Sequence, residues 1–491
     1  MNISSENFDP RQDKTGHVVV VGGGIAGLAA AYYLQKESVS QGKPLRITLI
    51  EAEDRVGGKI VTERIDGFTI EGGPDCFLRQ KPWAAELAAE IGLSTEMIGT
   101  NPENRGVFVL NRGKLVRLPE GVMLIIPTRF MPFVTSPLIS PVGKLRMGMD
   151  LFVPPNRDNG DESVASFVRR RLGIEALEKI AEPLLGGIHV SDPERQSLLA
   201  TFPRFRDLEK KYGSLIRGML AQRKNNHHTR MVKGEGNSLF LSFRKGLSEL
   251  SEGLANYLRD SGCQLMLSCR VEKIDSQNGR SVNLQLSNGE FLKADGVIIA
   301  VPAFSAAEMI HAFAPQTAEL LRRIDYVSTA TISIAYRLSD ISRSFTGYGF
   351  VVPRKEGRML QACTWTSLKF SNRAPQGHIL MRGFLGGPGK EEVVNYDDKE
   401  ILGIVRRELK EIQKIDAEPV FSRIYRWRAG NPQYYVGHLE LVQKIFETAA
   451  DEMPRVVLTG SAYQGVGIPD CIHNAKRSAT ALYQTLFQEE C

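Results

Sequence analysis

The sequence predicts an α/β fold in which one parallel sheet is assembled from three separated stretches of the chain, with α+β insertions between them. Residues 18–27 read VVVVGGGIAG, a buried strand followed by a glycine-rich turn. Another buried strand is expected at 296–302, and a strand, glycine-rich turn and helix at 455–487. A chain of 491 residues exceeds a single hydrophobic core, so the insertions are long enough for further lobes.

The glycines of the first turn follow the pattern GxGxxG, which is typical of folds that bind a dinucleotide at a helix N-terminus. Gly22 permits a tight turn, Gly24 lets a pyrophosphate approach the backbone, and Gly27 lets helix and strand pack closely. Glu51 ends the next predicted strand, ITLIE, where a carboxylate accepts hydrogen bonds from ribose hydroxyls. The sequence therefore predicts a Rossmann-like cofactor site.

Changes in periodicity divide the chain into six expected segments. Residues 1–16 have no apolar core and are predicted to be a disordered lead-in, not a signal peptide. Helical periodicity dominates 161–260, and the period becomes two from Cys263 onward. We expect a discontinuous nucleotide-binding domain, a helical insertion that lines a cavity or faces a membrane, and a sheet-based substrate domain. In chain order the segments after the lead-in are 17–100 (nucleotide-binding), 101–235 (helical), 236–310 (nucleotide-binding), 311–440 (sheet) and 441–491 (nucleotide-binding).

Some elements can be predicted in detail. Residues 161–185 form a helix with capping residues at its head and Pro183 at its tail. Alternation over 263–275 predicts a strand, followed by a hairpin that turns at Asn288 and Gly289. Further strands are expected within 329–385, at TATISIAYRL, GYGFVVP, LQACTWT and ILMRGFL.

Composition narrows the class of protein. Hydrophobic residues make up 42% and charged residues 24% of the chain, as in an ordinary soluble protein. The net charge of +6 is spread along the sequence, so we expect no nucleic-acid partner. The six cysteines form no CxxC pair and the adjacent His227 and His228 share no face, so we expect reduced thiols, no metal site and a cytoplasmic location.

The most membrane-like stretch, Gly121 to Phe152, is interrupted by four prolines and cannot form a spanning helix of ~20 apolar residues. Two interpretations stay open. The stretch lines an internal cavity, or it makes a peripheral contact with a bilayer.

Four segments carry a family resemblance. They read EGGPDCFLRQKP, EPLLGGIHVSDPERQSLLATFPRF, RWRAGNPQYYVGH and GSAYQGVGIPDCI, beginning at residues 71, 182, 426 and 460. With them the chain resembles the flavin amine-oxidase and phytoene-desaturase superfamily. Within it the chain is similar to the bacterial porphyrinogen oxidases of haem synthesis, the coproporphyrinogen III oxidases formerly called protoporphyrinogen oxidases.

The resemblance implies an FAD site and one substrate contact. The implied FAD contacts are Gly22, Gly23, Gly24, Ile25, Ala26 and Gly27 at the pyrophosphate, Glu51 and Ala52 at the adenosine ribose, Lys59 after the second glycine pair, Gly73, Pro74, Asp75 and Cys76 beside the isoalloxazine, Val271 at the adenine, and Trp427, Val466, Gly467 and Ile468 at the flavin ring. Lys81 lies where its ammonium meets a substrate propionate. Relatives often have Ser in place of Cys76, which puts a hydroxyl hydrogen bond in doubt.

The implied reaction is oxidation of coproporphyrinogen III to coproporphyrin III by FAD and dioxygen, with hydrogen peroxide as a product. Each round moves a hydride to flavin N5, and the helix that begins near Pro469 stabilises the reduced flavin anion. FAD is expected to be noncovalent, because the C-terminal glycine turn lacks the cysteine that many amine oxidases use for attachment. A hand-off of product to ferrochelatase is a further expectation.

Other charged residues in these segments are weaker candidates. Arg79, Arg204 and Arg206 could meet carboxylates, but we expect them on the solvated surface. His189 and His438 are expected to be structural, and no catalytic base can be named.

Four alternatives stay open. They are a protoporphyrinogen IX oxidase, an amine oxidase, a carotenoid desaturase, whose hydrocarbon substrate gives Lys81 no partner, and a non-catalytic porphyrin-binding flavoprotein.

Overall fold

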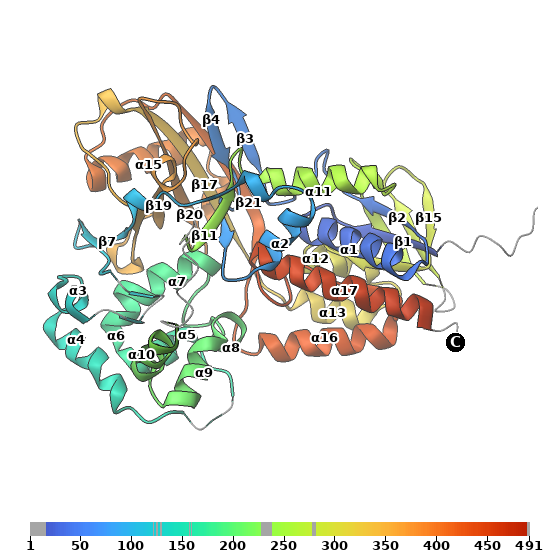
Figure 1. Ribbon diagram of the computed structural model, residues 1–491, viewed down its shortest axis with the longest axis horizontal. Helices are drawn as coiled ribbons and strands as arrows, with labels where there is room; N and C mark the ends of the chain where they lie inside the picture. The colour runs from blue at the N-terminus through green and yellow to red at the C-terminus, as the bar shows by residue number, and fades with distance from the viewer. Residues whose placement is uncertain are drawn as a thin grey trace, which may run out of the picture.

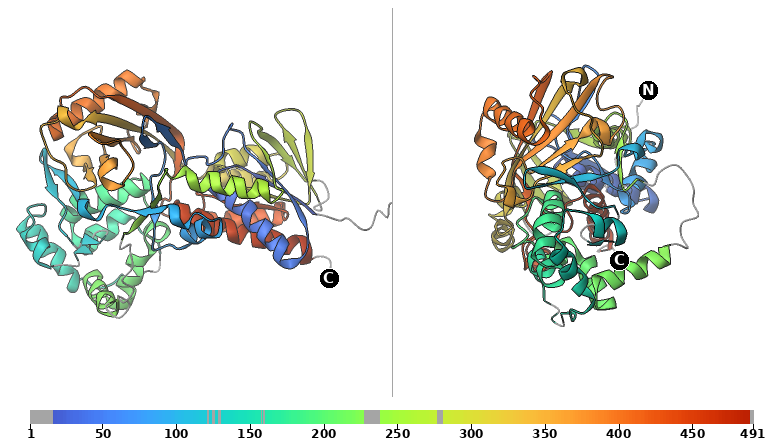
Figure 2. Two further views of the ribbon diagram at one scale, coloured as in Figure 1. Left: turned by 45° about the horizontal axis from the view of Figure 1, so that its top comes forward. Right: turned by 90° about the vertical axis from the view of Figure 1, so that its left-hand side faces the viewer.

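The computed structural model describes residues 16–488, apart from residues 121, 124–125, 128–129, 157, 159, 227–237 and 277–280. Three lobes are visible in Figures 1 and 2: a nucleotide-binding lobe with α1 and α17, a sheet lobe with β17 and β20, and a helical lobe with α3 to α10. The predicted lead-in lies outside the described residues except for Gly16, which belongs to the first strand. His227 and His228 also lie outside them.

The central sheet confirms that three distant stretches of sequence form one layer. Its strands run in the order β12-β2-β1-β16-β22 and are all parallel. Val18 and Val20 pack into one core with α1 and α17, whereas Val19 and Val21 pack into a second core on the opposite face. Both faces are covered, which explains the unbroken run of valines. The elements are β1 (Gly16–Val21), α1 (Ile25–Gln41), β2 (Leu45–Ile50), β12 (Gln264–Met266), β16 (Gly296–Ile299), β22 (Val456–Leu458) and α17 (Ile468–Gln488).

The predicted strand at 263–275 is wrong in one respect, because it divides into two strands of different sheets. The chain turns at Ser268, whose φ is 51°, and Val271 begins β13 instead of ending a strand. The following hairpin turns at Gly289, as predicted. This small sheet and three helices cover the second face of the central sheet: β13 (Val271–Asp275), β14 (Val282–Leu286), β15 (Phe291–Ala294), α12 (Ala303–Ile310), α13 (Pro315–Arg322) and α16 (His438–Glu452).

The sheet lobe contains seven strands in the order β21-β17-β20-β19-β18-β7-β8. The four strands predicted within 329–385 are confirmed. The expectation of a purely helical insertion at 101–235 is wrong at its start, because β7 pairs with β18 and β8 completes a hairpin. The elements are β7 (Val107–Asn111), β8 (Lys114–Arg117), β17 (Tyr326–Arg337), β18 (Gly349–Val351), β19 (Ala362–Trp365), α14 (Thr366–Lys369), β20 (His378–Gly386), α15 (Asp398–Gln413) and β21 (Phe421–Pro432).

The helical lobe has its own buried core, and its main helix differs from the prediction. Ser163 caps α5 by accepting a hydrogen bond from the Ser166 amide, but the helix ends at Gly173, whose φ is 91°. Pro183 does not end a helix, because α7 continues directly from the π-helix at 177–181, where the Glu182 amide donates to the Leu177 carbonyl, and runs on to His189. The helices are α3 (Phe130–Thr135), α4 (Pro141–Gly148), α5 (Val164–Leu172), α6 (Ile174–Ala176), the π-helix η4 (Leu177–Ala181), α7 (Glu182–His189), α8 (Leu198–Thr201), α9 (Pro203–Tyr212) and α10 (Leu215–Asn226).

Short elements connect the lobes. A three-stranded sheet of β5, β11 and β6 lies where the lobes meet, next to α2 and α11. These remaining elements are β3 (Thr62–Ile65), β4 (Phe68–Glu71), β5 (Phe77–Leu78), α2 (Trp83–Glu90), β6 (Met97–Gly99), β9 (Val122–Met123), β10 (Ile126–Pro127), β11 (Phe240–Phe243) and α11 (Ser248–Asp260). Among the described residues, no helix combines the length and the apolar character needed to cross a membrane.

Candidate active site

The glycine turn at the N-terminus of α1 has the geometry of a dinucleotide cradle. Gly22 has a φ of +105°, which the turn requires. A Cβ on Gly27 would lie 1.8 Å from the carbonyl oxygen of Gly22, so helix and strand touch there. A Cβ on Gly24 would meet no protein atom within 4 Å, because the space in front of the helix is open. That space suits a pyrophosphate on the helix amides.

The carboxyl end of β2 carries Glu51, the carboxylate that is expected at a ribose. One oxygen of the Glu51 carboxylate accepts a hydrogen bond from the Gly23 amide at 2.5 Å, and the other accepts from Glu53 at 2.9 Å. Ala52, which follows, is exposed. The Cys269 amide donates to the Glu51 carbonyl, and this bond brings the start of β13, with Val271, beside the carboxylate. Glu51, Ala52 and Val271 are therefore neighbours, although 219 residues separate Ala52 from Val271 in the sequence.

A second glycine turn carries Lys59 to the cradle. The Gly57 amide donates to the Gly23 carbonyl at 2.8 Å, and a Cβ on Gly73 would lie 1.7 Å from the Lys59 carbonyl. Burial lowers the pKa of the Lys59 ammonium, and the Cys471 thiol acts against this shift. Within the described part of the chain, Lys59 has no ion pair. A buried ammonium without a carboxylate fits an anionic cofactor.

The residues expected at the flavin ring converge from three elements. Trp427 on β21 donates its indole N–H to the Gly72 carbonyl at 3.0 Å, and Arg382 on β20 donates to the Gly73 carbonyl. The start of α17, in the nucleotide-binding lobe, lies close to the same region. Its Cys471 thiol acts to raise the pKa of the Lys59 ammonium, and its Asp470 carboxylate forms an ion pair with Lys81. The partly exposed residues of this region are Gly73, Pro74, Asp75, Cys76, Trp427, Val466 and Gly467, whereas Ile468 is buried.

Lys369 is a site residue that the sequence did not reveal. Its Nζ lies 2.8 Å from an Asp75 oxygen and 3.4 Å from the Cys76 sulfur, between the rings of Phe240 and Phe370. Burial opposes ionisation of Asp75, but Lys369 and Arg382 outweigh it and hold the pKa of Asp75 well below its usual range. Burial raises the pKa of the Cys76 thiol to about 12. Lys369 lies 294 residues from Asp75, and no motif surrounds it.

Lys81 is also paired. Its Nζ lies 2.6 Å from each carboxylate oxygen of Asp470, in the first turn of α17. His189, at the end of α7, lies close enough to Lys81 for the ammonium to affect it. Burial and, to a smaller extent, the Lys81 charge lower the pKa of the His189 ring to about 4. His438 stacks on Tyr434 at 4.0 Å and bonds the Tyr463 carbonyl, as a structural histidine does.

The three candidate arginines differ in their exposure to solvent. Arg79 and Arg204 are exposed, as expected. The expectation for Arg206 is wrong: its side chain is 2% exposed and pairs with Glu162 at 2.9 Å and with Glu209 at 3.2 Å. Spacing along α9 turns Arg206 inward, where the carboxylates compensate the charge.

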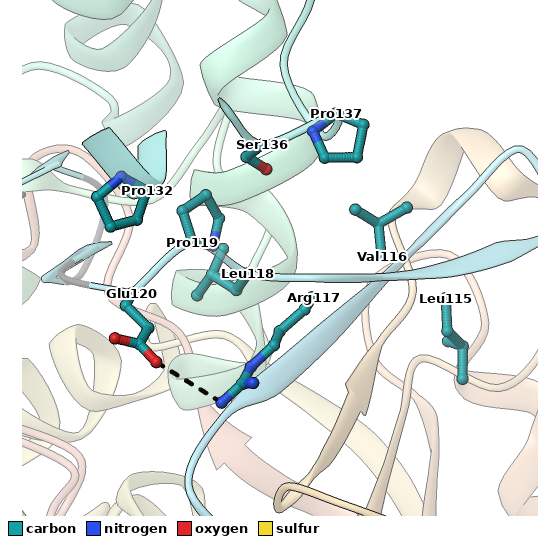
Figure 3. A pocket seen from close by; sticks show the side chains of 9 residues that line it. All are labelled: Leu115, Val116, Arg117, Leu118, Pro119, Glu120, Pro132, Ser136 and Pro137. Atoms are coloured by element: carbon teal, nitrogen blue, oxygen red, sulfur yellow. Dashed lines mark ion pairs between the residues drawn. The ribbon is translucent and has the colours of Figure 1, made fainter. Parts of the chain in front are cut away.

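A pocket of about 400 Å³ lies apart from these residues, between β8 and α3 (Figure 3). Its walls are mostly apolar, and its charged pair, Arg117 and Glu120, is separated by 3.9 Å. None of the residues predicted at the cofactor lines it. The pocket is therefore distinct from the candidate active site.

Comparison with known proteins identifies the family. The model of the flavin-containing amine oxidoreductases matches residues 25–483. The chain belongs to this family. The coproporphyrinogen III oxidase of Bacillus subtilis (strain 168) is 37% identical to this oxidoreductase over 96% of the chain and 98% of the relative. That of Staphylococcus aureus is 36% identical over 95% and 98%.

More distant relatives agree. Protoporphyrinogen oxidase 1 of Arabidopsis thaliana is 30% identical over 94% of this chain and 87% of its own. A solved structure from Exiguobacterium sp. 255-15, assigned by likeness as a protoporphyrinogen oxidase, has a TM-score of 0.83 and 32% identity over 96% of this chain and 99% of its own. The oxidoreductase thus belongs with the porphyrinogen oxidases of its family.

FAD is the cofactor of this family member, and the residues fit it. The open space at Gly24 suits the pyrophosphate, and the Glu51 carboxylate suits a ribose. Lys59, which has no ion pair among the described residues, suits an anionic group of the cofactor. Bound FAD supplies hydride acceptance and electron transfer to dioxygen. The protein residues would bind and orient the FAD: the α1 amides would hold the pyrophosphate, and the α17 N-terminus would provide partial positive charge at the ring end.

Proposed function

We propose that this oxidoreductase converts coproporphyrinogen III to coproporphyrin III with dioxygen as the acceptor. The observation that carries the proposal is the 37% identity with a coproporphyrinogen III oxidase along 98% of that relative. Lys81, at the flavin end of the cradle, supplies a cation for an acidic edge of the substrate. The product is aromatic and fluorescent, unlike the substrate.

The reaction removes six hydrogens from the porphyrinogen in three rounds. In each round a meso carbon loses a hydride and a pyrrole nitrogen loses a proton, and both electrons reduce dioxygen to hydrogen peroxide. Tautomerism presents a new C–H bond for each round and moves one further meso proton onto a ring nitrogen, so that four hydrogens in total leave the meso carbons and two leave the nitrogens. The protein therefore needs one site that orients a large apolar disc with carboxylates at its rim.

The direct test offers the purified holoenzyme coproporphyrinogen III, protoporphyrinogen IX and a primary amine in air, in separate reactions. We expect fastest formation of fluorescent porphyrin from coproporphyrinogen III, with three equivalents of hydrogen peroxide per porphyrin. Faster turnover of protoporphyrinogen IX would select the alternative that the plant relatives represent. Peroxide from the amine alone would refute the proposal.

We also propose that this enzyme is cytoplasmic and makes a peripheral membrane contact. Consecutive elements of the helical lobe present large apolar side chains to solvent: Met131 is 67% exposed, Val142 77%, Leu145 72% and Phe152 80%. Large apolar side chains that are exposed on consecutive elements are candidates for an interaction surface. Co-sedimentation with phosphatidylglycerol vesicles should be lost in the Val142→Ser, Phe152→Ser double variant. Equal sedimentation of variant and wild type would contradict the proposed membrane contact.

A ferrochelatase is the proposed recipient of the product, because metal insertion consumes a free porphyrin with four unoccupied central nitrogens. A competition experiment tests this hand-off. Metal insertion should resist an added porphyrin-binding trap when the oxidase is present, and full sensitivity to the trap would contradict direct transfer.

A further inference from the structure

The ammonium of Lys81 already has a carboxylate partner. Both oxygens of Asp470 lie 2.6 Å from Nζ, and the two side chains are 42% and 18% exposed. Because Asp470 neutralises the Lys81 charge and takes up to two of its three N–H donors, a substrate carboxylate competes with Asp470 for the ammonium. The Lys81 ammonium is therefore already paired. A substrate carboxylate that binds to it exchanges with the Asp470 carboxylate.

Local structure keeps Asp470 in place when Lys81 turns away. Asp470 lies in the first turn of α17, where the partial positive charge of a helix N-terminus stabilises an anion. A Cβ on Gly465 would come within 2.5 Å of the Asp470 Cβ, and one on Gly467 within 3.0 Å of its Oδ2. The glycines thus make room for this carboxylate at the flavin end of the site.

Among the described neighbours, His473 lies one turn further along α17 and interacts electrostatically with Asp470, but burial and the Arg477 charge lower the pKa of its ring. Burial lowers the pKa of His189 to about 4, so its ring is neutral at pH 7. Lys59 and Lys369 lie within the site, but the first is beside Cys471 and the second is held by Asp75. Asp470 and an incoming carboxylate therefore compete for the one cation that the described residues place at this point, Lys81.

We propose that Asp470 is an internal substitute for a substrate propionate, exchanged at Lys81 when a porphyrinogen binds. The inference rests on the proposed function and adds a specificity-determining residue to it. The exchange breaks N–H···O bonds to Asp470 and forms equivalent bonds to the propionate, with no transfer of protons or electrons. Lys81 then contributes little net affinity, but it selects ligands with a carboxylate at the rim, because an uncharged rim cannot replace Asp470.

The proposal predicts that removing Asp470 strengthens binding. Lys81 is then free in every molecule, and apparent affinity rises with the fraction of the protein that is competent to bind. An ion pair of this exposure corresponds to about 1.4-fold to fivefold in affinity. A residue that served the chemistry or the fold would give the opposite sign.

The experiment is a double-mutant cycle on the FAD-loaded enzyme. Binding of coproporphyrin III is followed by fluorescence quenching in wild type, Asp470→Asn, Lys81→Met and the double variant. We expect Asp470→Asn to lower the Kd by up to about fivefold, and to change nothing in the Lys81→Met background. The tetramethyl ester of coproporphyrin III, which has no carboxylate, should bind wild type and Asp470→Asn equally.

Flavin absorbance and Tm report whether each variant is folded and loaded, and Asp470→Ser replaces Asp470→Asn if the amide is not tolerated. Unchanged or weaker binding by a folded, loaded variant overturns the inference, as does an equal gain in the Lys81→Met background. A fall in kcat at unchanged Kd also overturns it, because Asp470 would then act in the reaction. If wild type binds no coproporphyrin III, the proposed function and the inference fail together.

Discussion

Gly24 and Gly27 are three residues apart, yet they serve different partners. A Cβ on Gly24 meets no protein atom within 4 Å, so Gly24→Ala should change the free energy of unfolding of the apoprotein by less than about 1 kcal/mol. The same methyl group occupies the space for the pyrophosphate, so FAD affinity should fall at least about tenfold. Fluorescence titration with FAD and urea unfolding measure the two effects.

Gly27→Ala is the matched comparison. Its Cβ would lie 1.8 Å from the Gly22 carbonyl oxygen, which forces α1 away from β1. Overpacking of this kind costs about 2–3 kcal/mol, so the apoprotein itself should be destabilised. Equal apoprotein stability in the two variants would contradict the separate roles.

Lys369 holds the charge of Asp75 beside the candidate flavin position. Lys369→Met removes the ammonium 2.8 Å from a carboxylate that is 16% exposed. Breaking one half of a buried pair costs about 3 kcal/mol, which should appear as a lower free energy of unfolding in urea. Lys355→Met, which removes an exposed pair with Glu178, is the control and should stay within about 0.5 kcal/mol of wild type. The account of this pair fails if the two variants are equally stable.

Glu71 gives the fold an unusual pH dependence. Burial, opposed by the Thr62 hydroxyl and by Arg373, raises its pKa from the usual 4.5 to about 7. The folded state therefore holds this proton more tightly than the unfolded state does. Its contribution to stability is complete below pH 4.5 and is lost as the pH rises to about 7.

Glu71→Gln removes this titration. The stability of wild type minus that of the variant should therefore fall between pH 4.5 and about 7 and then become constant. Urea unfolding of both proteins across this range measures the difference. A difference that rises with pH would mean that Glu71 is ionised throughout.

At the residue scale, sequence patterns predicted the cradle but not its charge partners. GxGxxG and the strand-terminal Glu51 depend on local backbone geometry, which a short motif encodes. Asp75 and Lys369 are 294 residues apart, and Lys81 and Asp470 are 389 apart. Contacts between such distant residues depend on the folded topology, so no local pattern indicates them.

Among the elements, the buried pair Arg171 and Asp150 joins α5 to the start of α10. Both side chains are fully buried, and the Asp150 carboxylate also accepts from the Ser214 hydroxyl at 2.6 Å and the Ile216 amide at 3.0 Å. Arg171→Leu should cost about 3–5 kcal/mol, because Asp150 loses its cation. Hydrogen exchange should localise the loss to the helical lobe.

Arg169→Leu is the control on the same helix, since Arg169 is 45% exposed and pairs with Glu194 at the surface. Its stability should stay within about 0.5 kcal/mol of wild type. Faster exchange spread evenly over the three lobes of the Arg171→Leu variant would contradict a lobe-specific role.

At the element scale, periodicity identified strands and helices better than it identified their partners. The short apolar run of β7 is compatible with a strand. The partner of this strand is β18, more than 200 residues away in the sequence, and periodicity cannot indicate it. The helix predicted at 161–185 has the right period, and Gly173 together with the π-helix η4 interrupts it. Such interruptions arise from packing in the lobe core, which periodicity does not describe.

For the whole molecule, one cofactor site depends on three distant pieces of chain. The central sheet unites β1, β16 and β22, and bound FAD should stabilise all three together. FAD at 100 times its Kd should add about 2.7 kcal/mol and raise the Tm of the apoprotein. Heat denaturation should release the yellow flavin through a filter, because we expect FAD to be bound noncovalently. Flavin retained on the denatured chain would contradict noncovalent binding.

The central claim is that this folded site draws electrons from a porphyrinogen into its flavin. Anaerobic mixing of the FAD-loaded enzyme with coproporphyrinogen III tests it most directly. The account predicts that the absorbance of oxidised flavin disappears, and that admission of air restores it with release of hydrogen peroxide and coproporphyrin III fluorescence. Flavin that stays oxidised in the presence of coproporphyrinogen III would contradict it.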